Sequence, residues 1–331
     1  MLKNNMRKFV AQRLLQLIPL LIGISLISFF VMHLAPGDPT ALFIDPNVKP
    51  EELARVRANW GLDQPIYIQY FKWLINAGKL DFGVSYITGQ PVISEIGERL
   101  PATLLLMISS MILTFLIAVP IGVYSAVKKG SWFDNFFTVF SFAGMAIPAF
   151  WLALMLMLLF SVQLGWLPAV GMFSPLIKDA SIVTRLLDLL RHMILPLFSM
   201  ALLSLAGISR YQRAAMLEVL NQDFIKVARA KGLPEITVIF KHALRNALIP
   251  IVTILGLSLP DLFGGAFVIE TVFAWPGMGR LGVQSIFQRN YPDIMGIVML
   301  SAVLIILGNL LADIGYALVD PRIRYEKISK K

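Results

Sequence analysis

Six long apolar runs divide the sequence, separated by segments in which charged residues, Gly and Pro gather. A hydrocarbon core about 30 Å thick is crossed by about 20 consecutive apolar residues in a helix. The pattern therefore predicts six membrane-spanning helices. They lie at about 14–34, 102–127, 133–160, 193–208, 248–268 and 294–319.

The longest polar interruption, residues 36–99, is predicted to carry two short helices outside the membrane. Pro50 is followed at once by acidic residues, which suit a first helical turn, and Gly61 lies beyond the end of that helix. A second helix is predicted from Pro65 to Ala77, with an apolar stripe that includes Tyr70 and Trp73. Tyr and Trp are enriched at membrane interfaces, so both helices are expected to rest on the bilayer surface.

The distribution of Lys and Arg predicts the orientation of the chain. If the N-terminus is cytoplasmic, the inner segments carry most of the basic residues and few acids, as the positive-inside rule requires. Six spans then place both termini in the cytoplasm. The expected segments are 1–35 (N-terminus and first span), 36–99 (extracytoplasmic), 100–320 (core of five spans) and 321–331 (cytoplasmic tail).

Composition supports an integral membrane protein and excludes several other classes. Hydrophobic residues make up 57% of the chain and charged residues 15%. The net charge of +9 follows from the inner basic segments, so we expect no nucleic-acid partner. The sequence contains no Cys, no phosphate-binding loop of the G-x-x-x-x-G-K-[ST] type, and no His spacing typical of a metal site. We therefore expect no enzymatic activity, cofactor or metal on this chain.

The most charged stretch, residues 221–255, is predicted to form a bent pair of helices. Phe224, Val227 and Ala228 recur at helical spacing before a Gly232-Leu233-Pro234-Glu235 break. After the break, one helical stripe is predicted from the apolar residues Ile236, Ile239, Phe240, Ala243, Leu244 and Ala247. On charge and spacing alone, a basic loop adhering to anionic lipid and a docking element for another protein fit equally well.

The fifth apolar run and the segment after it are rich in small and kink-forming residues. Asp261 and Asp313 are candidate intramembrane carboxylates, and both are expected to lie near helix ends without a role in transport. The segment 270–293 predicts a compact turn, which either gates a pathway or rests at the interface. The candidate gate and pathway residues are Pro260, Gly264, Gly265, Phe273, Trp275, Pro276 and Gly277.

Several motifs resemble those of a known transporter family. The run from Asp223 to Gly232, followed by His242-Ala243-Leu244-Arg245-Asn246, is similar to the cytoplasmic "EAA" loop of ABC-importer permeases, although Lys226-Val227-Ala228 stands where the general pattern has Glu-Ala-Ala. Gly61-Leu62-Asp63-Gln64-Pro65 and Phe273-Ala274-Trp275-Pro276-Gly277 are similar to other family motifs. The chain resembles the "B"-type permease of the dipeptide, oligopeptide and nickel importers.

This resemblance implies a fold and a set of partners. The fold would be an all-α, type I ABC-importer transmembrane domain with six helices, located in a bacterial or archaeal cytoplasmic membrane. A second, similar permease would complete a heterodimer, two ATPase subunits would bind ATP and Mg, and an extracytoplasmic binding protein would deliver the substrate. Peptides are the expected substrate, with nickel, oligosaccharides or glutathione as alternatives; a secondary transporter or channel is the alternative from another class.

The resemblance also assigns the segment 221–246 as the coupling loop that docks on an ATPase. The residues expected to carry this role are Asp223, Phe224, Val227, Ala228, Arg229, Ala230, Lys231, Gly232, Leu233, Pro234 and Glu235.

Overall fold

The computed structural model describes residues 2–34, 37, 39–40, 50–177, 180–257 and 259–319. Within that part of the chain the regular elements are helices, and the only β-pairing is an isolated bridge between Val84 and Pro91. The chain divides into two compact units. The first contains residues 1–103 and 276–307, and the second contains residues 104–275 and 308–331.

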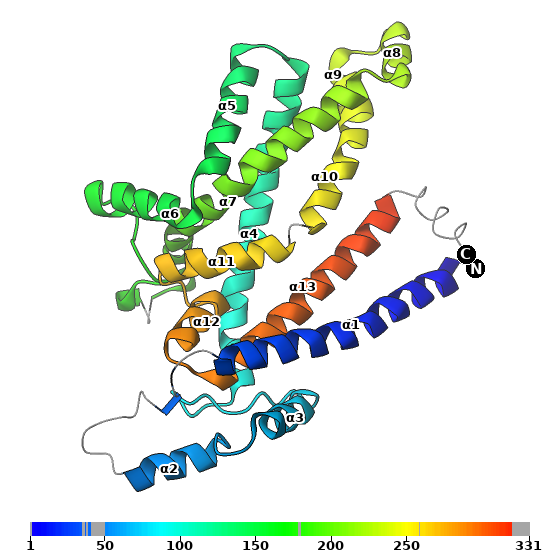
Figure 1. Cartoon of the computed structure of the whole chain (residues 1–331). Coiled ribbons are helices and arrows are strands. Elements are labelled where there is room, and N and C mark those ends of the chain that lie inside the picture. The colour runs from blue at the N-terminus through cyan, green and yellow to red at the C-terminus, as the bar shows by residue number, and fades with distance from the viewer. Residues whose placement is uncertain are drawn as a thin grey trace. The chain divides into compact units, whose positions relative to one another are not determined.

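The first unit contains the N-terminal helices and the start of the last one (Figure 1). It comprises α1 (Leu2–Leu34), α2 (Pro50–Asn59), α3 (Ile66–Ala77), the start of α4 (Val92–Val127), α12 (Met278–Phe287) and the start of α13 (Tyr291–Val319). The two short helices predicted in residues 36–99 therefore form, as α2 and α3, and their position at the membrane surface stays a prediction. Pro65 directly precedes α3 and Gly78 directly follows it.

Aromatic side chains from distant segments form the core of the first unit. Phe29 of α1, Tyr70 of α3 and Tyr291 of α13 are buried together in one cluster. Beside it, Asn290 Nδ2 donates to Ser85 Oγ at 2.8 Å and to Asp293 Oδ2 at 2.6 Å. Asn290 and Ser85 lie 205 positions apart, so their hydrogen bond fixes the start of α13 against the N-terminal segments.

The second unit contains the rest of α4 and the helices that follow it. They are α5 (Trp132–Ala146), α6 (Ala149–Met157), α7 (Ile182–Leu220), α8 (Asp223–Ala230), α9 (Glu235–Thr237), α10 (Arg245–Leu257) and α11 (Leu259–Val272). Two π-helical turns, η2 (Leu158–Gln163) and η4 (Val238–Leu244), and a 3₁₀ turn, η3 (Pro175–Ile177), interrupt them. Helix α7 lies at the centre, in contact with α5, α6, α10 and α11.

Among the described residues, three helices are long and apolar enough to cross a membrane as single rods. They lie at Leu15–Leu34, Val92–Val127 and Tyr291–Leu310. Two further candidates are bent pairs of helices: α5 with α6 and η2, at an angle of 103°, and the two halves of α7, at 47°. The expected span 133–160 is bent at Pro148, between α5 and α6. The expected span 193–208 lies within α7, a longer helix that is itself bent and runs to residue 220.

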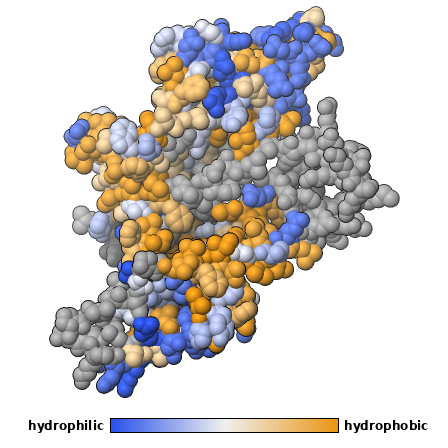
Figure 2. Space-filling model, in the orientation of Figure 1, coloured by the Kyte–Doolittle hydropathy of each residue, from blue (hydrophilic) through white to orange (hydrophobic). Residues whose placement is uncertain are grey.

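The fifth expected span, 248–268, is covered by two helices, α10 and α11. They meet at residue 258, which lies outside the described part of the chain, and α11 turns away from the line of α10 (Figure 1). The side chains of Asp261 and Asp313 and the whole of the expected tail 321–331 also lie outside the described residues. The surface of α6 is mainly hydrophobic, as a membrane-embedded element requires (Figure 2).

Candidate functional site

The predicted bend in the basic segment is present, and we call residues 223–244 the elbow. Helix α8 begins with an acidic residue, Asp223, whose negative charge interacts favourably with the positive end of the helix dipole. It ends at Ala230, and Gly232 then adopts φ of +75°, a left-handed conformation that L side chains rarely adopt. Pro234 precedes the first residue of α9 and fixes the start of the second arm.

One ion pair closes the elbow across its turn. Arg229 Nη2 donates to Glu235 Oε1 at 2.7 Å, and Arg229 Nε donates to Glu235 Oε2 at 3.1 Å. The side-chain hydrogen bonds from Arg229 lower the pKa of Glu235 from its usual value of 4.5, and the same bonds raise the pKa of Arg229. This paired geometry holds the last turn of α8 to the first turn of α9.

The inner face of the elbow packs on the core of the second unit. Ile225 and Ala228 of α8 and Val238 and Ala243 of η4 are buried. They belong to the same apolar cluster as Met216 of α7 and the last turns of α4. The inner face of the elbow is therefore in direct contact with α7 and α4 through one apolar core.

The outer face of the elbow exposes large apolar side chains among the charged ones. Phe224 is 41% exposed, Val227 52%, Ile236 68% and Phe240 58%. Figure 2 shows mostly hydrophilic residues over α8, with hydrophobic residues among them. Large apolar side chains rimmed by charges are typical of a protein interaction site.

The structure corrects the predicted apolar stripes of the elbow. Sequence spacing grouped Phe224 with Ala228 and Ile236 with Ala243, but in each pair the first residue is exposed and the second is buried. In the second arm the reason is the π-helical turn η4, in which Val238 and Ala243, five residues apart, share the buried face. In the first arm Ile225 takes the buried position.

The remaining predicted coupling residues lie together around the turn. Ala230 and Lys231 end α8, Leu233 is exposed after Gly232, and the Leu233 backbone N–H donates to the carbonyl of Ala228 at 3.4 Å. Sequence analysis did not single out Ile225, Ile236 or Phe240 for this site. For the second arm the missing signal was the π turn, because its register cannot be seen in α-helical spacing.

A second contact that the sequence analysis missed joins α7 to the turn before α5. Asp134 is 2% exposed and accepts two bonds from Arg213, at 2.5 Å from Nε and 2.8 Å from Nη2. Its Oδ2 also accepts the backbone N–H of Gly130 at 2.9 Å. The C-terminal half of α7, which leads into the elbow, is therefore fixed to the α4–α5 turn.

The candidate gate residues fall into two groups. Pro260, Gly264 and Gly265 lie in α11, and nothing further is described of their side chains. Among the aromatic residues, Phe273 and Trp275 are both buried.

The backbone around this aromatic turn is held on both sides. The Trp275 backbone N–H donates to the Glu270 carbonyl at 2.8 Å, across Ala274 with φ of +49°. Gly277 precedes α12, and the Met278 backbone N–H donates to Thr103 Oγ1 at 2.8 Å. The turn expected at Pro276 and Gly277 therefore joins α11 to α12.

Comparison with known families identifies the class of protein. Residues 118–325 match the model of the binding-protein-dependent transport system inner membrane component, and residues 6–109 match the N-terminal model of the same kind of component. The chain belongs to this family. It is a multi-pass inner membrane component of a binding-protein-dependent transport system, and the family that the sequence motifs indicated is confirmed.

Curated relatives match this inner membrane component along their full length. The oligopeptide transport system permease protein AppB of Bacillus subtilis (strain 168) is 47% identical over 97% of this chain and 100% of its own. The dipeptide transport system permease protein DppB of Alkalihalophilus pseudofirmus is 38% identical, and the glutathione transport system permease protein GsiC of Escherichia coli (strain K12) is 40% identical, each with the same coverage.

A solved structure shares the fold of this inner membrane component. The methionine ABC transporter MetNI in an inward-facing conformation aligns with a TM-score of 0.54 and 20% identity, over 68% of this chain and 96% of that chain. The mainly helical fold of an ABC-transporter permease is therefore confirmed. The number of spans and the orientation of the termini stay predictions.

Proposed function

We propose that this inner membrane component is one half of the translocation pathway of an ATP-driven peptide importer. A second, similar permease would form the other half. Two ATPase subunits, which bind ATP and Mg, would lie on the cytoplasmic side, and an extracytoplasmic binding protein would deliver the substrate. This chain would itself hydrolyse nothing.

The elbow is the observation that supports this proposal most directly. It combines a rigid turn, closed by Arg229 and Glu235, with exposed apolar side chains and a buried inner face. An element that only adhered to lipid would not need a closed turn joined to the core. An ATPase groove that gripped this outer face could rotate the elbow and, through Ile225 and Ala228, displace α7 and α4.

ATP-driven movement also requires that the elbow contacts its partner differently in two states. A partner that bound it equally well in both states would shift no equilibrium. We therefore propose that Phe224, Val227 and Ile236 exchange contacts when the ATPases close on ATP. The exposed positions and the mixed charge of α8 suit such a reversible contact.

Cross-linking tests this assignment, and the absence of Cys from the chain makes single-cysteine variants simple to interpret. Val227→Cys and Ile236→Cys in the assembled transporter should link to an ATPase subunit through a thiol-to-amine reagent, with a yield that changes on addition of ATP. Tyr67→Cys, at an equally exposed apolar residue of α3, is the matched control and should give no such link. Links from Tyr67→Cys alone, or none from the elbow, would refute the coupling role.

The substrate proposal rests on the names of the relatives. Proteins named for oligopeptide and dipeptide transport match over the whole chain, and so does one named for glutathione transport. Glutathione is itself a small peptide, and it is therefore the second candidate. Uptake of labelled dipeptide, pentapeptide and glutathione by proteoliposomes, with and without ATP and with a protonophore present, distinguishes these substrates and separates ATP-driven import from proton coupling.

The proposal for the pathway and the outer gate rests on α11 and the turn that follows it. The small and kink-forming residues Pro260, Gly264 and Gly265 are clustered in α11, where close backbone approach suits a pathway wall. Phe273 and Trp275 are buried, and the chain continues through Pro276 and Gly277 into α12. We propose that this connection transmits gate movement and that its aromatic residues do not themselves block the path.

A further inference from the structure

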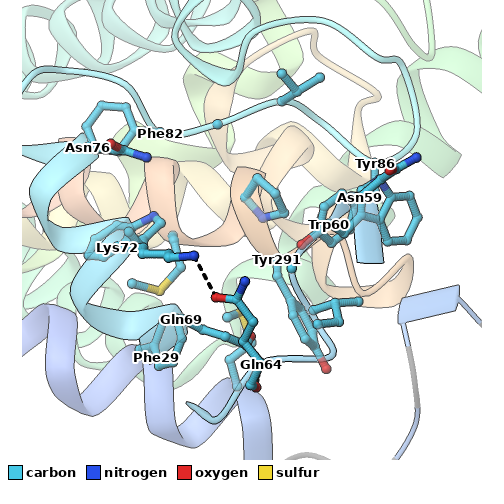
Figure 3. Close-up of a pocket in the computed structure, with 18 of the residues that line it drawn as sticks. Phe29, Asn59, Trp60, Gln64, Gln69, Lys72, Asn76, Phe82, Tyr86 and Tyr291 are labelled. Carbon is cyan, nitrogen blue, oxygen red and sulfur yellow. Dashed lines mark hydrogen bonds between the residues drawn. The ribbon is translucent and has the colours of Figure 1, made fainter. Parts of the chain in front are cut away.

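A cavity of about 510 Å³ opens in the first unit, among α1, α3, the start of α13 and the connecting segments near Trp60 and Phe82 (Figure 3). Every residue that lines it belongs to this unit. Its volume lies within the range, about 300–1,000 Å³, of protein sites that hold small molecules. The coupling role proposed for the elbow does not involve this cavity.

Two side chains of opposite charge line the cavity without pairing with each other. Lys72 Nζ donates to Gln64 Oε1 at 2.8 Å (dashed in Figure 3), and this neutral partner leaves the positive charge uncompensated. Asp81 accepts the backbone N–H of Gly83 at 3.0 Å, and within the described part of the chain it forms no ion pair. Lys72 is therefore able to bind a carboxylate, and Asp81 an ammonium group.

Primary amides on two sides of the cavity supply further donors and acceptors. Asn76 lies with Lys72 on α3, and Asn59 lies on the other side, at the end of α2 beside Trp60 (Figure 3). Neither of these two Asn side chains has a hydrogen-bond partner among the described residues. A primary amide offers both an acceptor and N–H donors, which match the N–H and C=O groups of a peptide bond.

Aromatic rings form much of the wall between these polar groups. Trp60 stacks on Tyr86, with ring centres 3.9 Å apart and ring planes 12° from parallel. Phe29 and Phe82 are buried and line the cavity from two other segments. Aromatic walls favour apolar side chains in a ligand. A short peptide with free termini and apolar side chains carries every group that this lining is able to bind.

The predicted topology places this cavity on the side from which substrate would arrive. Helix α3 and the segments around Trp60 and Phe82 all belong to residues 36–99, which are expected outside the membrane. The proposed binding protein would deliver its peptide on that side. The inference therefore rests on the function proposed above and adds a site to it.

We propose that this cavity binds a short peptide with free termini, of the class that the importer is proposed to carry. Lys72 binds the C-terminal carboxylate, Asp81 binds the N-terminal ammonium group, and Asn59 and Asn76 hydrogen-bond to the peptide bonds between them. A loop within a folded protein presents no free termini, so the two unpaired charges favour a free peptide over a loop of the binding protein.

Capped peptides test this proposal on the purified full chain in detergent, without transport. Equilibrium dialysis compares trialanine with trialanine amide, which lacks the carboxylate, and with N-acetyl-trialanine, which lacks the ammonium group. Lys72→Gln should weaken trialanine binding about fivefold and leave that of trialanine amide nearly unchanged. Asp81→Asn should weaken trialanine binding about fivefold and leave that of N-acetyl-trialanine nearly unchanged, because each variant removes a bond that the capped peptide already lacks.

Two matched controls make the same charge changes outside the cavity. Lys79 and Asp63 are exposed and do not line it, so Lys79→Gln and Asp63→Asn should bind trialanine as the unmodified chain does. Lys72 and Asp81 are themselves exposed, and Asn in place of Asp81 keeps an oxygen that accepts the Gly83 N–H, so both cavity variants are expected to fold.

Three results would overturn the site. One is the absence of trialanine binding, another is an affinity that capping either end leaves unchanged, and the third is unaltered binding of all three peptides by both cavity variants. Peptide import by the assembled transporter together with any of these results would leave the proposed function intact. Binding with the expected pattern by a chain whose transporter imports no peptide would instead refute the proposed function and keep the site.

Discussion

At the scale of single residues, the elbow depends on one backbone conformation and one ion pair. Gly232 turns the chain with φ of +75°, and an added Cβ would meet no atom within 4 Å. Steric crowding therefore does not require Gly here. The requirement comes from the backbone, because a β-branched side chain is strained at positive φ.

The effect of replacing Gly232 should accordingly depend on how well the new residue tolerates a positive φ, and not on the size of its side chain. Gly232→Val is expected to cost about 2 kcal/mol in the local turn and to reduce substrate-stimulated ATP hydrolysis by the assembled transporter. Gly232→Asn, which tolerates this conformation, should retain most of that activity. Equal loss in both variants would show that contact with a partner, and not the turn, requires Gly.

The ion pair of the elbow predicts a dependence on pH. The pKa of Glu235 is lower in the folded turn than in the open one, so the pair stabilises the turn fully above the usual carboxyl pKa of 4.5. This stabilisation is lost as the pH falls below that value and through the lowered pKa. Hydrogen exchange at the Leu233 amide should stay equally protected between pH 7 and pH 5 and lose protection in more acidic buffer, after correction for the intrinsic exchange rate. In Glu235→Gln this loss should be absent.

At the scale of elements, the sequence predicted the positions of helices better than their shapes. Apolar runs and the Gly-Pro break located α1, α3, α8 and α13, because hydrophobic spacing and turn residues act locally. The 103° bend between α5 and α6 and the π turn η4 were not predicted. Pro148 marks the place of the bend but not its angle, and α-helical spacing in the sequence does not reveal a π turn.

The π turn predicts which single deletions the second arm tolerates. Deletion of the exposed Lys241 brings Val238 and Ala243 from five to four residues apart, a spacing that still shares one face in an α-helix. Deletion of the exposed Asn246, in α10, instead rotates Ala247 and Ile251 by about 100° away from the core. The first variant should accumulate in membranes nearly normally and the second should not, as measured by immunoblot and thermal denaturation. The opposite order would contradict the π register.

The contact between α7 and the α4–α5 turn predicts a difference between two neighbouring arginines. Arg213→Gln leaves the buried Asp134 without its charged partner and should destabilise the protein by about 2 kcal/mol. Arg210→Gln removes contacts with two aromatic rings, 5.4 Å from the Phe142 ring centre and 6.0 Å from that of Tyr211, and should cost less than about 1 kcal/mol. Thermal denaturation of the two variants in detergent measures the difference.

At the scale of the whole molecule, the membrane topology was predicted from basic residues and remains to be measured. Single-cysteine variants give that measurement in a chain without Cys. With intact cells and a membrane-impermeant maleimide, Lys79→Cys should react, and Lys129→Cys and Asn221→Cys should react only after the membrane is permeabilised. Labelling of Asn221→Cys in intact cells would place the elbow outside and refute both the orientation and the ATPase contact.

The composition of the chain was enough to predict its class, because apolar segments of this length have few roles other than crossing a membrane. The elbow could be located from its motif, but its exposed apolar residues, Ile236 and Phe240, could not. The same holds for the cavity of the first unit, whose lining converges from segments such as Phe29, Lys72 and Tyr291 that sequence order keeps apart. Local chemistry was therefore predictable, and convergence of distant segments was not.

The bend at Pro148 has a consequence for how the second unit deforms. The fifteen residues of α5 reach about 22 Å, which is shorter than the hydrocarbon core of a bilayer, about 30 Å thick. Pro148 offers no N–H to the Gly144 carbonyl, so backbone bonding is already interrupted there before any motion begins. Tilting α5 against α6 would therefore break no further backbone hydrogen bond of the helix. A force applied to this unit would bend it first at Pro148.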